Sequence, residues 1–205
     1  MAGKTELRRD RLRETLLEIA ERRIAENGYR ALTARELAAE AGCAVGAIYN
    51  IFKDMDALVA AMNTRTGARL ERAVAEAFAK NAEAGTPKRQ LVLLGRTYLA
   101  FVVENPLLWS AIFEQSARLG KEFAEKREAE NTRLVGHIVR PLKVLLPGAG
   151  EERLALVARA LFAAVHGIVS LGFQRRFLAE SPKEAEEQIV FIVEAFCDGA
   201  ALQKG

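Results

Sequence analysis

Apolar side chains recur at helical spacing along nearly the whole chain, with no convincing strand between them. Within residues 6–26, for example, Leu12, Leu16, Ile19, Ala20 and Ile24 fall on one stripe of a helix. Comparable stripes follow, separated by Gly, Pro and polar breaks. The pattern predicts an all-α fold of about nine helices, at residues 6–26, 34–41, 45–52, 55–78, 87–105, 107–119, 121–146, 151–178 and 182–202.

Capping residues and prolines set several of these boundaries. Gly28 ends the first helix, and Asp54 is the expected N-cap of the long helix at 55–78. Thr86-Pro87 and Ser181-Pro182 each combine an N-cap residue with a proline suited to the first turn. Pro141 lies inside the pattern of 121–146, so a kink or a break is expected there.

The stretch from Thr33 to Leu58 reads as a short helix, a tight turn and a second short helix. Thr33 and Glu36 have the spacing of a capping box, which begins a helix at about Ala34. Leu37, Ala38 and Ala41 then fall on one face of that helix. Gly42 follows where a residue of positive φ is needed to end it. A small residue, a turn glycine and a branched apolar residue in this order favour a helix-turn-helix.

The second helix of this pair has one apolar stripe, made of Ile48, Ile51 and Phe52. The other side chains are small or polar and point largely outward. That outer face is narrow enough to enter a groove of DNA. It consists of Val45, Gly46, Ala47, Tyr49 and Asn50.

With the flanking segments 27–32 and 49–58, this stretch resembles the DNA-binding domain of the tetracycline-repressor (TetR) family, over roughly the first 60 residues. The resemblance implies a homodimer that binds a double-stranded DNA operator. Ala44 and Met55 stand where the family commonly has a hydroxyl residue and a lysine, so Lys53 is expected to take over the phosphate contact. The DNA-binding residues expected are Thr33, Arg35, Ala44, Val45, Gly46, Ala47, Tyr49, Asn50 and Lys53.

Individual roles follow from side-chain chemistry. Thr33 and Tyr49 carry hydroxyls that can donate to phosphate. Asn50 can pair with adenine through two hydrogen bonds, and Val45 and Ala47 can touch thymine methyl groups. The expected domains are a DNA-binding domain at residues 1–55 and an effector-binding and dimerisation domain at 56–205.

The C-terminal part resembles a TetR ligand-domain subgroup named for a Trp-x-x-x-His-Gly pattern, with Phe162 at the Trp position and His166-Gly167 intact. Several aromatic residues fall on the apolar sides of their own helices, so a cavity between those helices would collect them. A mostly apolar small molecule is the expected effector. The residues expected to line its site are Tyr98, Phe101, Trp109, Phe113, Phe162 and His166.

His166 has two interpretations, because it lies in the nearly all-apolar run from Leu161 to Val169. An imidazole there needs partners for its ring nitrogens. It is either a core histidine with its hydrogen bonds satisfied or a polar anchor for a ligand. His137, on an amphipathic helix, is expected to be a surface or boundary residue.

The last two helices carry more apolar surface than one partner helix covers, for example at Leu171, Phe173 and Phe196. An ordinary monomer core is one explanation. The other is a two-fold dimer in which both helices meet their copies, which suits a protein that reads two half-sites about 34 Å apart.

Charge and cysteine content narrow the picture little. The net charge is +3, yet residues 1–60 hold ten basic and ten acidic residues, and only the first 13 residues are locally basic, with five cations against two anions. No apolar run approaches the roughly 20 residues of a membrane span, and the N-terminus lacks a secretory signal, so a cytoplasmic protein is expected. Cys43 and Cys197 are expected to be small buried hydrophobes, a thiol sensor being the alternative.

Signatures of enzymes are missing, since there is no phosphate-binding glycine loop, no nucleophile elbow and no metal-spaced Cys or His pair. No metal and no cofactor is expected. The sequence therefore predicts a ligand-responsive transcriptional regulator, a repressor by family habit, and not an enzyme. The alternative is an all-helical carrier protein whose N-terminal helix pair is structural.

Overall fold

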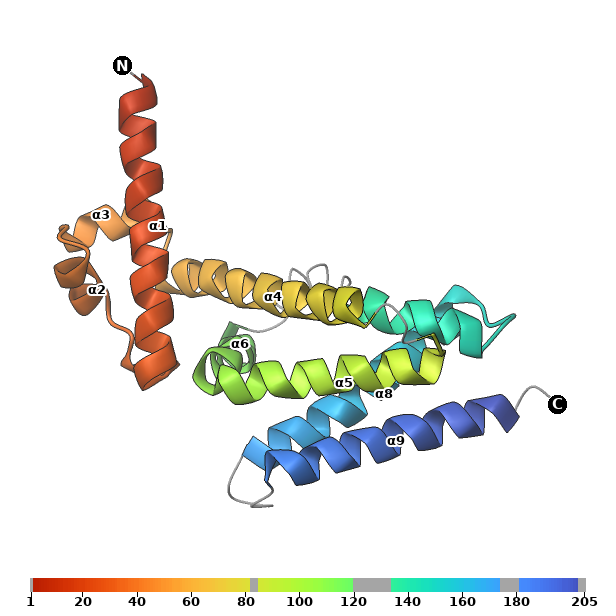
Figure 1. Cartoon of the computed structure of the whole chain (residues 1–205). Helices are drawn as coiled ribbons and strands as arrows, with labels where there is room; N and C mark the ends of the chain where they lie inside the picture. The colour runs from red at the N-terminus through yellow and green to blue at the C-terminus, as the bar shows by residue number, and fades with distance from the viewer. Residues whose placement is uncertain (1, 82–84, 120–133, 174–180, 203–205) are drawn as a thin grey trace. The chain divides into compact units, whose positions relative to one another are not determined.

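The described residues, 2–81, 85–119, 134–173 and 181–202, are helical in the computed structural model and contain no strand, which confirms the all-α prediction (Figure 1). Residues 134–145 are helical as well. The remaining elements are α1 (Ala2–Asn27), the 3₁₀ helix η1 (Tyr29–Ala31), α2 (Ala34–Glu40), α3 (Val45–Tyr49), α4 (Met55–Lys80), α5 (Pro87–Glu104), α6 (Pro106–Leu119), α8 (Glu151–Phe173) and α9 (Pro182–Leu202).

The chain divides into two compact units. The first comprises residues 1–68 and 105–125, and the second comprises residues 69–104 and 126–205. The helix α4 therefore contributes its N-terminal part to the first unit and its C-terminal part to the second. The helix α6 belongs to the first unit although it follows α5 of the second unit directly in sequence.

The first unit is built on α1, which packs against α2, η1 and α6. Its apolar stripe, predicted from the helical period, faces the common core of these elements. The side chains at the centre of that core are almost fully buried, and they come from α1, α2, α3 and α4: Leu16, Leu17, Ile24, Leu37, Ile48, Leu58 and Met62.

The helix-turn-helix has the predicted caps, with one difference. The Glu36 backbone N–H donates to the Thr33 hydroxyl oxygen at 3.3 Å, as in a capping box. The Glu36 carboxylate, however, accepts a hydrogen bond from the Thr33 hydroxyl at 2.8 Å instead of binding the Thr33 backbone. Gly42 has φ of +63°, a conformation that L side chains rarely adopt, and this turns the chain between α2 and α3.

Two buried amides join α4 to α6 within the first unit. Gln115 is fully buried and donates to the Asp56 carbonyl oxygen at 2.8 Å. Asn63, which is 6% exposed, donates to the Gln115 side-chain oxygen at 2.8 Å. Asp54 caps the start of α4 by accepting from the Ala57 N–H at 2.7 Å, as predicted.

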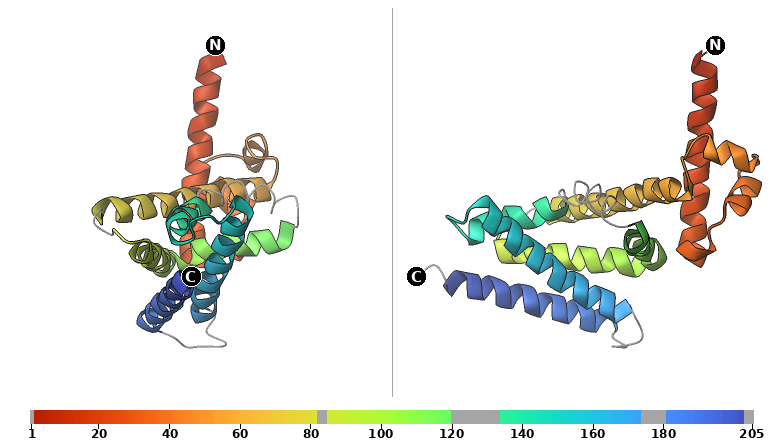
Figure 2. Two further views of the ribbon diagram at one scale, coloured as in Figure 1. Left: turned by 90° about the vertical axis from the view of Figure 1, so that its right-hand side faces the viewer. Right: turned by 180° about the vertical axis from the view of Figure 1, so that it is seen from behind.

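The second unit is organised around α5, which packs along α9, while α8 packs against both (Figure 2). The α5–α9 contact is close at Gly95. A Cβ atom added there would lie 2.6 Å from Ile189 Cγ2, so only glycine allows this approach. Ion pairs of Lys88 with Asp198 and of Arg96 with Glu186 flank the contact.

Helix starts in the second unit match the sequence. Thr86 accepts from the Arg89 N–H at 3.3 Å, and Ser181 and Glu184 form a reciprocal capping box. The break allowed at Pro141 is wrong, because residues 134–145 form one uninterrupted helix. The predicted segments 121–133 and 174–178 lie outside the described residues, except that 134 onward is helical.

By length and composition, Glu151–Gly172 of α8 is apolar enough to cross a membrane. Core helices of soluble proteins meet the same criterion, so this observation carries little weight. The α8 helix packs against α9 in the second unit.

Candidate functional site

The outer face of α3 is exposed, as predicted. Val45 and Tyr49 are 37% and 48% exposed, although both are large and apolar or aromatic. Ile48, on the opposite side, is completely buried in the core of the first unit. Gly46 and Asn50 are also exposed, whereas Ala47 is half-buried. The exposed side chains thus form a narrow ridge, and the buried ones fix the helix beneath it.

The other predicted DNA contacts lie at the edges of this ridge. Thr33 and Arg35, at the start of α2, and Lys53, after α3, are exposed. Ala44 is the N-cap of α3 and makes no side-chain capping bond. The Thr33 hydroxyl already donates to Glu36, so a bond from Thr33 to phosphate requires that this contact be given up.

Ion pairs hold α2 against α1 behind the ridge. Arg23 contacts Glu36 at 3.2 Å and Glu40 at 2.9 Å, and Arg22 also pairs with Glu40. These acids are therefore engaged with α1 side chains. Their charge is partly neutralised on the helix that precedes the ridge.

The structure also brings α1 to the C-terminal end of α3, a contact that the sequence did not indicate. Arg9 donates to the Asn50 carbonyl oxygen at 3.4 Å. The Arg13 guanidinium lies 5.4 Å from the centre of the Phe52 ring. Sequence counting did mark this end of the chain as basic, but the pairing is tertiary and follows from no local pattern.

A small apolar cavity of about 50 Å³ lies inside the second unit. Two of the predicted effector-site residues, Tyr98 and Phe162, line it. The remaining walls are aliphatic and come from α4, α5, α8, α9 and the helix at residues 134–145: Leu70, Val74, Leu91, Leu94, Gly95, Leu134, Ile138, Leu161, Val165 and Val193.

His166 lies beside this cavity and has hydrogen bonds at both ring nitrogens. Its Nδ1 is 2.9 Å from the Tyr98 hydroxyl, and its Nε2 is 3.1 Å from the Ser170 hydroxyl. The imidazole also stacks on Phe162, with ring centres 5.5 Å apart and planes 18° apart. Ser170 was not identified from the sequence, although it stands four residues after His166, one turn along the same face of α8.

The six predicted effector-site residues do not gather in one place. The structure brings Tyr98, Phe162 and His166 together, and Phe101 is buried in α5 without lining the cavity. Trp109 and Phe113 belong to the first unit, where their rings pair at 4.9 Å. The physical reason is that the apolar face of α6 packs on α1.

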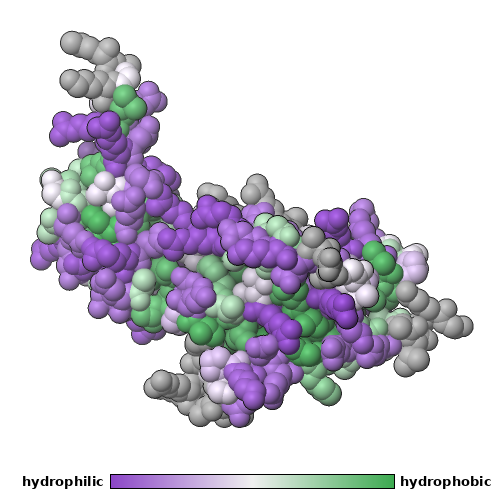
Figure 3. Space-filling view, viewed as in Figure 1, coloured by the Kyte–Doolittle hydropathy of each residue, from purple (hydrophilic) through white to green (hydrophobic). Residues whose placement is uncertain are grey.

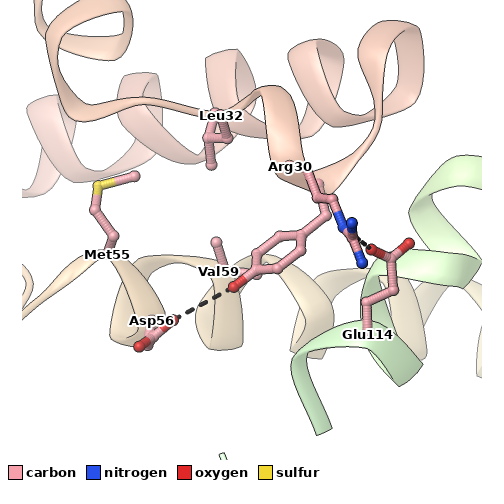
Figure 4. A pocket seen from close by; sticks show the side chains of 7 residues that line it. Arg30, Leu32, Met55, Asp56, Val59 and Glu114 are labelled. Atoms are coloured by element: carbon pink, nitrogen blue, oxygen red, sulfur yellow. Dashed lines mark hydrogen bonds and ion pairs between the residues drawn. The ribbon is translucent and has the colours of Figure 1, made fainter. Parts of the chain in front are cut away.

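A second hollow, of about 710 Å³, opens on the first unit between η1, α4 and α6 (Figure 4). Leu32, Met55 and Val59 give it an apolar floor. Polar contacts cross its rim, where Tyr29 donates to Asp56 at 3.4 Å and Arg30 pairs with Glu114 at 3.6 Å. No sequence pattern pointed to this groove, because its residues come from three separate segments.

Comparison with known protein families agrees with this architecture. A sequence model described as "Bacterial regulatory proteins, tetR family" matches residues 16–62, which contain α2 and α3. A second, "Tetracyclin repressor-like, C-terminal domain", matches residues 91–196, just over half of the chain. The chain belongs to the TetR family. As a TetR-family protein it is a DNA-binding helix-turn-helix regulator, and members of this family are not enzymes.

Solved structures share the TetR fold over nearly the whole chain. A protein of unknown function from Rhodococcus sp. RHA1 has 24% identity and a TM-score of 0.72, and the match covers 93% of this chain and 95% of that one. A putative TetR-family regulator from Mesorhizobium loti has 20% identity and a TM-score of 0.69, covering 92% and 96%. A TetR-family regulator from Streptomyces coelicolor has 19% identity and a TM-score of 0.71, covering 95% and 83%.

Proposed function

We propose that this TetR-family chain is a cytoplasmic, homodimeric repressor that binds a palindromic operator and leaves it when a mostly apolar small molecule binds. The observation that carries the proposal is the exposed ridge of α3, where Val45 and Tyr49 face solvent above a fully buried Ile48. Exposed apolar groups on a short, firmly anchored helix favour insertion into the major groove.

The predicted contacts divide into two groups by chemistry. Asn50, Val45 and Ala47 read base edges, because an amide pairs with adenine and apolar groups contact thymine methyls. Tyr49 and Lys53 bind phosphates and position the helix without reading sequence. Thr33, Arg35, Ala44 and Gly46 border the same surface.

Dimerisation through α8 and α9 is supported by apolar side chains left exposed on both helices. Phe191 is 72% exposed, Leu156 is 51% exposed and Leu171 is 44% exposed. Apolar patches of the second unit are visible on the face shown in Figure 3. Burying such groups against a symmetry-related copy is favourable, at about 25 cal/mol per Å². A two-fold axis would also present two α3 helices to two half-sites.

The effector is proposed to bind at the cavity beside Tyr98, Phe162 and His166. In its present state the cavity, at about 50 Å³, is far smaller than the roughly 300–1,000 Å³ typical of ligand pockets. A ligand must therefore push its walls apart. Leu70 and Val74 of α4 are among those walls, and α4 also contributes to the first unit. Opening the cavity thus displaces a helix shared with the DNA-binding part, and the ligand releases DNA to the extent that it prefers the opened state.

The assignment to the Trp-x-x-x-His-Gly subgroup remains part of this proposal, with His166 as the anchor for a polar group of the effector. The competing role for His166 is structural, and the bonds to Tyr98 and Ser170 favour it as long as no ligand is bound. The competing function for the whole chain is an apolar-ligand carrier that does not bind DNA.

A binding assay with labelled DNA from upstream of the chain's own gene separates regulator from carrier. We expect a salt-sensitive, competitor-resistant complex at nanomolar protein, as is usual for specific sites. The double variant Tyr49→Ala/Asn50→Ala should lose it while melting at the wild-type temperature. Equal affinity for that DNA and for unrelated duplex would contradict the repressor assignment for this site, and no affinity for any duplex would favour the carrier.

A further inference from the structure

The helix-turn-helix itself is poor in cations. Among the predicted contacts only Arg35 and Lys53 are positively charged, and residues 1–60 are neutral in total. Phosphate neutralisation nevertheless supplies most of the affinity of proteins for DNA. Further cations near α3 are therefore expected from another element.

The N-terminal half of α1 has both the position and the chemistry. Residues 5–11 are all exposed, and this half of the helix presents a mostly hydrophilic surface (Figure 3). Arg9 and Arg13 continue the stripe that, from Leu16 onward, faces the core of the first unit. Where the core ends, the same stripe becomes cationic.

Both arginines are fixed at the C-terminal end of α3. Arg9 donates one N–H to the Asn50 carbonyl oxygen at 3.4 Å and has four further donors. Arg13 covers the Phe52 ring at 5.4 Å with its face, so that the N–H groups around its edge stay available. Each guanidinium therefore holds a protein group and can still bind a phosphate.

Acidic residues of the same helix lie along a neighbouring line. Glu6, Asp10 and Glu14 follow one another at intervals of four residues. Glu14 pairs with Arg65 of α4, which directs this line toward α4. The arginine line is directed toward α3 instead.

We propose that Arg9 and Arg13 form a phosphate clamp, in which α1 binds the DNA backbone next to the base pairs read by α3. The inference rests on the proposed DNA-binding function and adds two contact residues that lie outside the helix-turn-helix. Because phosphate contacts carry no sequence information, the clamp raises affinity for every duplex equally.

The test compares Arg9→Ala and Arg13→Ala with Arg11→Ala. Arg11 is exposed on the same helix and has the same charge, but it points about 200° away from Arg9 around the axis. The affinity of the full-length protein for a mixed-sequence duplex is measured as a function of salt concentration. We expect the slope of log K against log salt to fall by about 0.9 for each clamp variant and to stay unchanged for Arg11→Ala. Arg9→Lys should recover most of the loss, since the charge is restored.

Other outcomes overturn the clamp. Equal losses in all three variants would indicate a general effect of charge, and an unchanged slope in Arg9→Ala and Arg13→Ala would show that neither touches phosphate. A lowered melting temperature with a wild-type slope would assign Arg13 a purely structural role over Phe52. If the wild-type protein binds no duplex at all, the proposed function itself fails, which is a different result from an unaltered slope.

Discussion

Asn50 stands at the C-terminal end of α3, with an exposed side chain and a backbone carbonyl bonded to Arg9. Its amide is the polar group on the ridge best suited to recognise a base. We expect Asn50→Ala to cost about 1–3 kcal/mol at one base position per half-site and little elsewhere. Binding measured on a set of single-base operator variants checks this. A uniform loss on every sequence would make Asn50 a backbone contact.

Lys53 and Tyr49 belong to the phosphate-binding group, so their loss should be felt equally on all sequences. Lys53→Ala should lower the salt slope by about 0.9, whereas Tyr49→Ala should weaken binding without a comparable change in slope. Lys183→Ala is the control, since this lysine of α9 is equally exposed and far along the chain. A normal slope in Lys53→Ala would mean that it does not replace the lysine usual at Met55.

Single side chains were predictable where a local pattern decides their direction. The outward placement of Val45, Tyr49 and Asn50 follows from the stripe of Ile48 and Phe52 alone. The contacts of Arg9 and Arg13 were not predictable, because they join residues about 40 positions apart across helix packing. Cys197 is buried as expected, but Cys43 is only half-buried against the core.

At the scale of elements, the close contact between α5 and α9 depends on Gly95. Gly95→Ala would bring a methyl group to 2.6 Å from Ile189 Cγ2, and we expect a loss of about 1–3 kcal/mol in the free energy of unfolding. Gly199→Ala, in α9, meets no atom within 4 Å and should stabilise by up to about 1 kcal/mol through helix propensity. Denaturant unfolding of both variants decides. Equal stability of the two would contradict the close approach.

Helices and their ends were largely predictable, whereas their partners were not. The period of apolar residues and the caps at Thr33, Asp54, Thr86 and Ser181 reproduce the observed bounds within a few residues. Periodicity identifies the buried stripe of α6 but not the surface that covers it. The proximity of α5 in the sequence suggested one cavity for Tyr98 and Trp109, and the packing of α6 on α1 separated them into two units.

For the whole molecule, the central prediction is selective loss of effector binding. His166→Ala should weaken ligands that carry a hydrogen-bonding group, barely change purely apolar ones, and leave DNA affinity intact. Tyr98→Phe is the matched control, because it removes the hydroxyl bonded to His166 Nδ1 and keeps the cavity wall. Titrations with both classes of ligand provide the measurement. Unfolding or loss of the dimer in His166→Ala, without selectivity, would establish the core-histidine role.

The amide pair between α4 and α6 fixes the two helices lengthwise. Apolar ridges tolerate sliding, but Gln115 and Asn63 find their partners in only one register. A shift of α6 by one turn would strand both amides in the core, at about 1–3 kcal/mol for each. Intermediate positions are therefore disfavoured, and the contact acts as a mechanical detent. Trp109 lies on α6 beside Phe113, so its fluorescence registers whether the detent has moved.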